Sequence, residues 1–96
     1  MATPFEIATT QRDTLEALMR DATATLREIT DQLAGDTPRV MGLTPDHVKA
    51  NPDWQQAKAT VDALFQALRT FNSFYVRTFK RELSATRNTQ RRALTR

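Results

Sequence analysis

Basic side chains that could bind an anion are concentrated near the end of the chain. Residues 69–96 carry eight basic side chains and one acidic one, whereas residues 1–68 carry six basic and ten acidic side chains. The formal net charge of +3 is therefore made of a negative block followed by a positive block. Such an asymmetry indicates an anionic partner. Arginine outnumbers lysine seven to one in the positive block, which favours forked contacts with phosphate groups.

The residues that could catalyse a reaction are few and stand alone. His47 is the only histidine, and the chain contains no cysteine. Ser73 and Ser84 lie in the basic segment without a base beside them. A catalytic or metal centre recruits several groups at a defined spacing, and neither an HExxH motif nor a glycine-rich phosphate loop is present. We therefore expect a protein that is not an enzyme, with no cofactor, no catalytic residue and no metal site.

A first long helix is expected at about residues 5–34. Thr3 followed by Pro4 is a typical helix start, and Gly35 is a typical helix end. From Leu15 onward the apolar residues are spaced alternately by four and three, which is typical of a coiled-coil or bundle helix. They are Leu15, Leu18 with Met19, Ala22, Leu26, Ile29 and Leu33.

Three further elements are expected in the rest of the chain. A linker at residues 35–44 leads to a short helix at about 45–50 and then to a long helix at about 52–89. Asn51 followed by Pro52 marks the start of this long helix, because asparagine is a favoured cap and proline a favoured first helical residue.

The linker and the chain end carry further expectations about packing. The apolar linker residues Val40, Met41 and Leu43 are expected to tuck under the ends of the helices. Trp54 is expected to pack against them and fill the loop end of the helix pair. The basic end of the chain, residues 87–96, is expected to extend past the helix pair or to fray.

The second long helix is expected to have an apolar face and a basic face. Its apolar residues cover about 140° of the helix circumference and its basic residues cover roughly the opposite 140°, whereas the stripe on the first helix covers about 100°. Asn72 falls inside the apolar arc, where it is either buried or reaches water at the margin. The apolar set is Trp54, Ala57, Val61, Leu64, Phe65, Leu68, Phe71, Tyr75, Val76, Phe79 and Leu83.

These elements predict an all-α fold and a single domain over residues 1–96. The two long helices are expected to form an antiparallel helical hairpin. A hairpin of this size is marginally stable alone, and the wider apolar arc cannot be covered by the narrower one. We therefore expect a homodimer in which two hairpins form a four-helix bundle. Burial of the same arc in a different partner protein is the alternative.

The predicted binding surface consists of the basic face and one aromatic residue. Phe74 projects away from the apolar arc and precedes Arg77 and Arg81 by one and two turns. Aromatic residues combined with arginine are enriched where proteins bind other proteins or stack on bases. The complete predicted set is Arg69, Phe74, Arg77, Lys80, Arg81, Arg87, Arg91 and Arg92.

Three interpretations of this surface are open. In the first, it binds nucleic acid or a nucleoprotein through the phosphate backbone. In the second, the chain is a small adaptor or inhibitor, of the kind that mobile elements encode, and docks on an acidic protein surface with Phe74 as an anchor. In the third, the acidic start of the first helix (Glu6, Asp13 and Glu16) neutralises the basic residues. We favour the first interpretation.

The sequence also bears on where the protein is located. No apolar run approaches the roughly 20 residues of a membrane span. The first residues, MATPFEIATTQRD, lack the basic start and the apolar core of a secretory signal. We expect a cytoplasmic protein without a membrane partner.

Overall fold

Regular structure in this chain is helical. The structure, a computed structural model, describes residues 1–38 and 40–94; residue 39 of the linker and residues 95–96 of the basic end lie outside the described residues. The elements, in order, are α1 (Pro4–Ala34), a short 3-10 turn η1 (Val40–Gly42), α2 (Asp46–Lys49), α3 (Pro52–Thr78) and α4 (Lys80–Leu94). No strand occurs within the described ranges, and the all-α fold class is confirmed.

Local side-chain chemistry determines where the long helices begin and end. Thr3 caps α1, because its hydroxyl oxygen accepts the N–H of Glu6 at 3.1 Å. Asn51 caps α3 in the same way by accepting the N–H of Asp53 at 2.9 Å. α1 ends at Gly35, which has a φ of 53°, a conformation that glycine adopts without the steric penalty of a Cβ atom.

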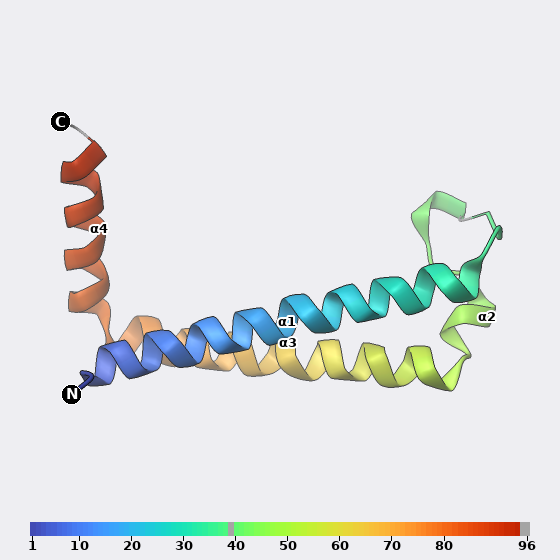
Figure 1. Cartoon of the computed structure of the whole chain (residues 1–96), viewed down its shortest axis with the longest axis horizontal. Coiled ribbons are helices and arrows are strands. Elements are labelled where there is room, and N and C mark those ends of the chain that lie inside the picture. Colours follow the sequence, from blue (N-terminus) through green and yellow to red (C-terminus); the bar gives the residue numbers. More distant parts are fainter. Residues whose placement is uncertain (39, 95–96) are drawn as a thin grey trace.

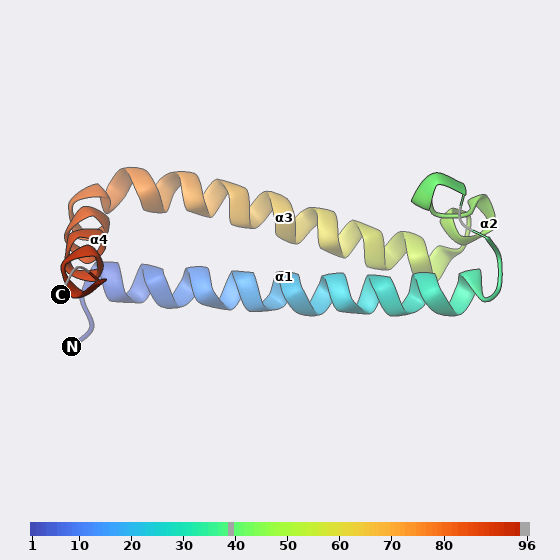
Figure 2. The ribbon, with the colours of Figure 1, turned by 90° about the horizontal axis from the view of Figure 1, so that it is seen from above.

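α1 and α3 lie side by side along their length and run in opposite directions (Figures 1 and 2). Two hydrogen bonds join them, one near each end. The Tyr75 hydroxyl lies 2.7 Å from the Thr9 hydroxyl, and the Trp54 indole N–H donates to the Thr30 hydroxyl at 2.9 Å. The two pairs are separated by the same number of residues on both helices, so that both bonds fit a single antiparallel register.

Each threonine in these two bonds acts as an acceptor toward the other helix. The Thr9 hydroxyl donates to the Phe5 carbonyl at 2.8 Å, and the Thr30 hydroxyl donates to the Leu26 carbonyl at 2.7 Å. A hydroxyl has a single proton and two lone pairs, so each threonine oxygen accepts the proton of its aromatic partner. The polar atoms of Tyr75 and Trp54 are thereby satisfied inside the helix interface.

An aromatic cluster closes the end of the helix pair that holds the start of α1. Tyr75 and Phe79 are only 2% and 8% exposed, and Ala8 is buried with them. The Phe5 ring stacks on Tyr75 at 5.8 Å between centroids and packs on Phe79 at 5.5 Å. Leu83 of α4 packs against the same cluster. The burial of several rings here stabilises the contact between the start of α1 and the end of α3.

The opposite end of the helix pair is closed by α2. Val48 is fully buried, and the Nε2 atom of His47 lies 3.1 Å from the Leu33 carbonyl, which is one of the last carbonyls of α1 and has no partner within that helix. The only histidine therefore holds α2 against the end of α1.

The apolar linker residues are less buried than the sequence suggested. Met41 is 92% exposed and has a φ of 54°, and Leu43 is also exposed. The expectation that these two residues tuck under the helix ends is wrong, and Val48 of α2 is the buried apolar residue at this end of the helix pair. The side chain of Val40 lies outside the described residues. Trp54 is half-buried and is held through its indole N–H by α1.

The chain turns sharply after Thr78, and α4 runs transverse to α3 (Figure 1). The expectation of one continuous helix at about residues 52–89 is therefore wrong. The break lies at Phe79, which has φ −112° and ψ 32° and still donates its N–H to the Tyr75 carbonyl at 3.0 Å. Helix breaks usually coincide with proline or glycine, whereas here the buried Phe79 ring lies at the turn.

The two threonine acceptors generate a stability prediction. Replacing Thr9 or Thr30 with valine leaves the Tyr75 hydroxyl or the Trp54 indole without its acceptor, and each change should destabilise the fold by about 1–2 kcal/mol. Thr23→Val is the matched control, because the described hydrogen bond of the Thr23 hydroxyl is to Met19 of its own helix. Urea denaturation should show a loss for the first two variants and little change for the third. Equal losses in all three would contradict this role.

Candidate functional site

The structure places the eight predicted binding residues on two helices. Arg69, Phe74 and Arg77 belong to α3, and the remaining five belong to α4. All eight are exposed. The break at Phe79 turns α4 away from α3, so that these residues do not share one straight helix face (Figure 1). The α4 residues are Lys80, Arg81, Arg87, Arg91 and Arg92.

α4 is a basic helix that extends beyond the helix pair (Figure 1). Its five basic residues fall within about 140° of its circumference at 100° per residue, and its one acidic residue, Glu82, lies in the first turn. Leu83 packs against the aromatic cluster, and α4 has no buried residue. A cationic helix face that is exposed in this way can approach a large anionic surface.

A shallow groove, open to solvent and lined by α3 alone, runs along one side of this helix beside two of the predicted residues. Phe65 and Val76, which are 51% and 57% exposed, form part of its apolar lining. Arg69 and Arg77 contribute its basic side chains. The other lining residues are Leu68, Asn72 and Ser73.

A concave corner lies where the start of α1, the end of α3 and α4 meet. Arg12 of α1 lines it together with Lys80 and Arg87 of α4. The corner shares Asn72 and Val76 with the groove on α3, so that the two hollows are neighbours. Together they form what we call the basic track. Its corner is completed by Phe5, Thr9, Glu16, Tyr75, Leu83, Ser84, Thr86 and Gln90.

Arg12 is held in place at the edge of the corner. Its guanidinium carbon lies 4.9 Å from the centre of the Tyr75 ring, a favourable cation–π distance. Its nitrogens lie 3.3 Å from Asp13 and 3.9 Å from Glu16. These contacts compensate part of its charge and orient the side chain before any ligand arrives.

The same ion pairs bear on the charge balance between the two helices. Asp13 and Glu16 were candidates for neutralising the basic end of the chain, but the ion pairs described for them are with Arg12 of their own helix. Surface pairs of this kind contribute little to stability. Glu16 also lines the corner with Lys80 and Arg87, so that neutralisation of the basic residues by the acidic start of α1 stays a prediction.

Phe74 lies apart from the basic track. It is 44% exposed, and its ring packs against Phe71 at 5.9 Å and edge-on against Phe79 at 6.2 Å. It lines a different hollow on α3 with Leu15, Gln66, Ala67, Thr70 and Phe71, all of which are uncharged. The expected combination of Phe74 with Arg77 and Arg81 in one patch is therefore not found in either hollow.

Three residues of the basic track were missed by the sequence analysis as site residues. Phe65 fits the apolar arc and is therefore predicted as a core residue, Arg12 is absent from the predicted binding set, and Asn72 is predicted to be either buried or at the margin of the arc. Asn72 is half-buried and lines both hollows. The one available signal was the width of the apolar arc on the second helix, since an arc wider than its partner leaves apolar residues such as Phe65 at the surface.

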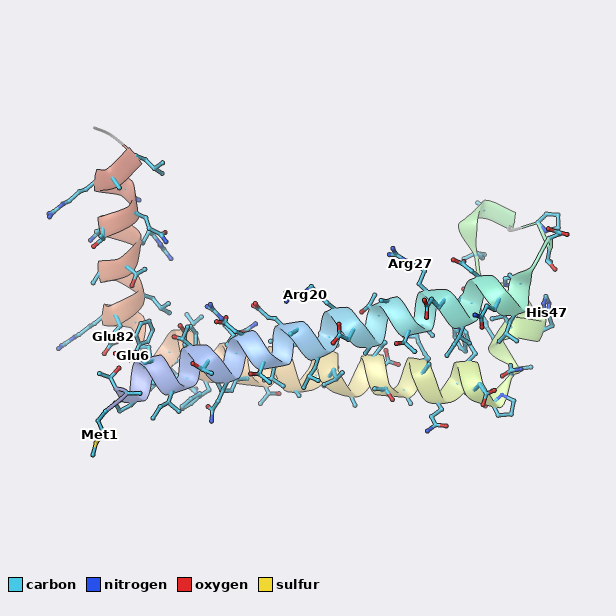
Figure 3. The ribbon with its side chains drawn as sticks, viewed as in Figure 1. Met1, Glu6, Arg20, Arg27, His47 and Glu82 are labelled. Atoms are coloured by element: carbon cyan, nitrogen blue, oxygen red, sulfur yellow. The ribbon has the colours of Figure 1, made fainter. Side chains whose placement is uncertain are left out.

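The single histidine lies far from the acidic residues near the corner. His47 lies at the end of the helix pair opposite Glu6 and Glu82, which mark the corner end (Figure 3). Within the described ranges, no three side chains of metal-binding type come together. Over the same residues, no helix is both long and apolar enough to cross a membrane.

Comparisons with protein-family models, with curated proteins and with solved structures gave no match to this chain. The function is therefore argued from the geometry and charge of the basic track and of α4.

The buried Phe79 ring lies at the turn between α3 and α4, which leads to a prediction. Phe79→Ala removes contacts to Phe5 and Tyr75 and should destabilise the protein by about 3 kcal/mol. Phe74→Ala is the matched control and should cost less, because Phe74 is half exposed. Urea denaturation measures both losses.

The same variant should also loosen α4. The chain has no cysteine, so spin labels attached at Thr10→Cys and Thr89→Cys report the distance between α1 and α4 without interference. We expect a broader distance distribution in Phe79→Ala than in Phe74→Ala. Identical distributions would show that the Phe79 ring does not hold the turn.

Proposed function

We propose that this chain is a non-catalytic protein that binds nucleic acid, or a nucleoprotein, through phosphate contacts made by α4 and the basic track. One observation carries the proposal. From Arg69 to Arg92 the chain has seven basic residues and one acidic residue, and all seven are exposed. Such a surface is the electrostatic footprint of nucleic-acid binding.

The expected mechanism is electrostatic and largely independent of base sequence. Each phosphate that is neutralised by lysine or arginine releases condensed counterions, so that affinity falls steeply with salt. Guanidinium groups add forked hydrogen bonds to phosphate oxygens. Six of the seven basic residues are arginines, which favours phosphate over a diffuse acidic surface.

A protein partner is the alternative proposal, and the arrangement favours it less. In that proposal Phe74 anchors the chain on an acidic protein surface beside Arg77 and Arg81. The hollow that Phe74 lines is otherwise made of uncharged residues, and Arg77 belongs to the groove along α3. Phe74 and Arg77 are neighbours on α3 but line different hollows, so that neither hollow offers both an aromatic anchor and a cation.

We also propose that two chains pair into a four-helix bundle. Two hollows on the helix pair are lined partly by polar residues (Gln32, Asp53, Gln56, Thr60, Gln66 and Thr70). Their apolar lining residues make up what we call the apolar face: Leu15, Ile29 and Leu33 of α1 and Ala57, Ala67, Phe71 and Phe74 of α3. By the helical period they share one side of the helix pair, whereas Val76 and Thr9 of the basic track lie toward the other. Asp53 is the only charged residue lining the two hollows of the apolar face. Pairing through it would extend a thin core and leave the basic track free.

The binding proposal is tested with two variants of equal charge change. Arg81→Gln/Arg92→Gln removes two cations from α4, and Arg20→Gln/Arg27→Gln removes two from α1 (Figure 3). Labelled nucleic acid is titrated by fluorescence anisotropy between about 50 and 200 mM salt. The α4 variant should lose affinity. The plot of the logarithm of its association constant against the logarithm of the salt concentration should become less steep by about 2. The α1 variant should behave as the unaltered protein. Absence of binding, or equal losses, would overturn the proposal.

Pairing is tested by light scattering coupled to size-exclusion chromatography. The unaltered chain should elute with the mass of a dimer at micromolar concentration. Ala67→Glu places a charge on the apolar face and should yield monomers, whereas Ala59→Glu, at another exposed alanine of α3, should remain dimeric. A monomeric unaltered chain would rule out the four-helix bundle as a homodimer.

A further inference from the structure

We infer that the basic track accepts single-stranded nucleic acid, with one base stacked on Phe65 and the adjoining phosphates held by the arginines and the lysine on either side. This inference rests on the proposed function and specifies which form of nucleic acid the track takes.

The apolar floor of the groove is the first reason. Phe65 is 51% exposed although its position fits the core pattern, and it lies in one hollow with Arg69 and Arg77. Proteins that bind single strands combine a positively charged groove with aromatic side chains on which bases stack. The bases of a duplex are stacked on one another and are not available to an aromatic side chain, so only an unpaired strand can use this ring.

The neighbouring position of the two hollows is the second reason. From Phe65 to Val76 the groove runs along α3 for about 16 Å at 1.5 Å per residue. The corner begins beside Asn72 and Val76, which line both hollows. Cations lie on the track at intervals: Arg69 and Arg77 along the groove, and Lys80 and Arg87 at its end. A flexible strand can follow a path that turns from α3 into the corner, whereas a stiff duplex cannot bend over so short a length.

The polar lining of the corner is the third reason. Ser84 and Gln90 of α4, together with Asn72, provide hydroxyl and amide groups that can bond to the edges of unpaired bases. Arg12 of α1 lines the corner together with Lys80 and Arg87 of α4, and it is already oriented by Tyr75 and Glu16. Cations that two helices contribute to one concave site suit a phosphodiester strand that lies in it.

The decisive experiment compares an oligothymidylate with a duplex of the same length, using matched variants of the full chain. Phe65→Leu removes an exposed aromatic ring from the track and keeps an apolar side chain there. Phe74→Leu makes the same change on the other side of α3. We expect Phe65→Leu to weaken single-strand binding about tenfold without affecting duplex binding, and Phe74→Leu to change neither. Circular dichroism confirms that both variants are folded.

A second pair of variants separates the track from the outer face of α4. Lys80→Gln/Arg87→Gln changes the corner, and Arg81→Gln/Arg92→Gln changes basic residues of α4 that do not line it. The corner variant should lose more affinity for the single strand than for the duplex, whereas the outer variant should lose affinity for both to a similar extent. Methyl signals of Val76 and Leu83 should shift in NMR spectra on addition of the oligothymidylate.

The outcomes distinguish this inference from the function on which it rests. If nucleic acid binds but Phe65→Leu behaves as Phe74→Leu, and the corner variant affects both forms alike, the single-strand inference is wrong and the binding function stands. If neither form of nucleic acid binds the unaltered chain, both are wrong.

Discussion

The arrangement of this protein depends on the register in which α1 packs against α3. Few side chains are fully buried, so the shape of the core alone gives little discrimination between neighbouring registers. The hydrogen bonds from Tyr75 to Thr9 and from Trp54 to Thr30 supply that discrimination, because a shift of either helix would leave a donor at each end without its acceptor. The register in turn sets Phe5 against Tyr75 and Phe79, and these contacts fix where α3 stops and α4 begins.

The unequal widths of the two apolar stripes divide the surface into two parts with different chemistry. α3 carries more apolar side chains than α1 can cover, and the surplus appears on both sides of the helix pair. On one side it lies among uncharged residues, as around Phe74. On the other it lies between arginines, as around Phe65. We interpret the first as a surface for a second chain and the second as a surface for a charged polymer.

Much of the secondary structure was predictable because it depends on local chemistry. Thr3, Gly35 and Asn51 act at the helix ends within a few residues of their own positions, and each end lies where the sequence indicates. The break at Phe79 was not predictable, since neither proline nor glycine marks it and the Phe79 ring packs there on Phe5, far away in the sequence. The exposure of Met41 also depends on how the linker folds and not on its local sequence alone.

The basic residues of the candidate site were predictable, but their grouping was not. Charge and helical period identify Arg69 to Arg92 as a positive segment, whichever way the chain folds. Periodicity assumes a straight helix, however, and a bend in the axis changes which residues meet. The bend brings Lys80 and Arg87 to the same hollow as Arg12. Periodicity also does not distinguish Phe65 from a core residue, because both occupy the same angular sector of the helix.

The transverse setting of α4 has a thermodynamic consequence. A ligand in the corner touches α1 and α4 at once, although these helices are joined mainly through Phe79 and Leu83. Binding would therefore favour the bent chain over any form in which α4 swings away. By reciprocity, whatever stabilises the bend raises the affinity by the same factor. Ligand binding in the corner and packing of the aromatic cluster are therefore coupled, because both favour the bent form of the chain.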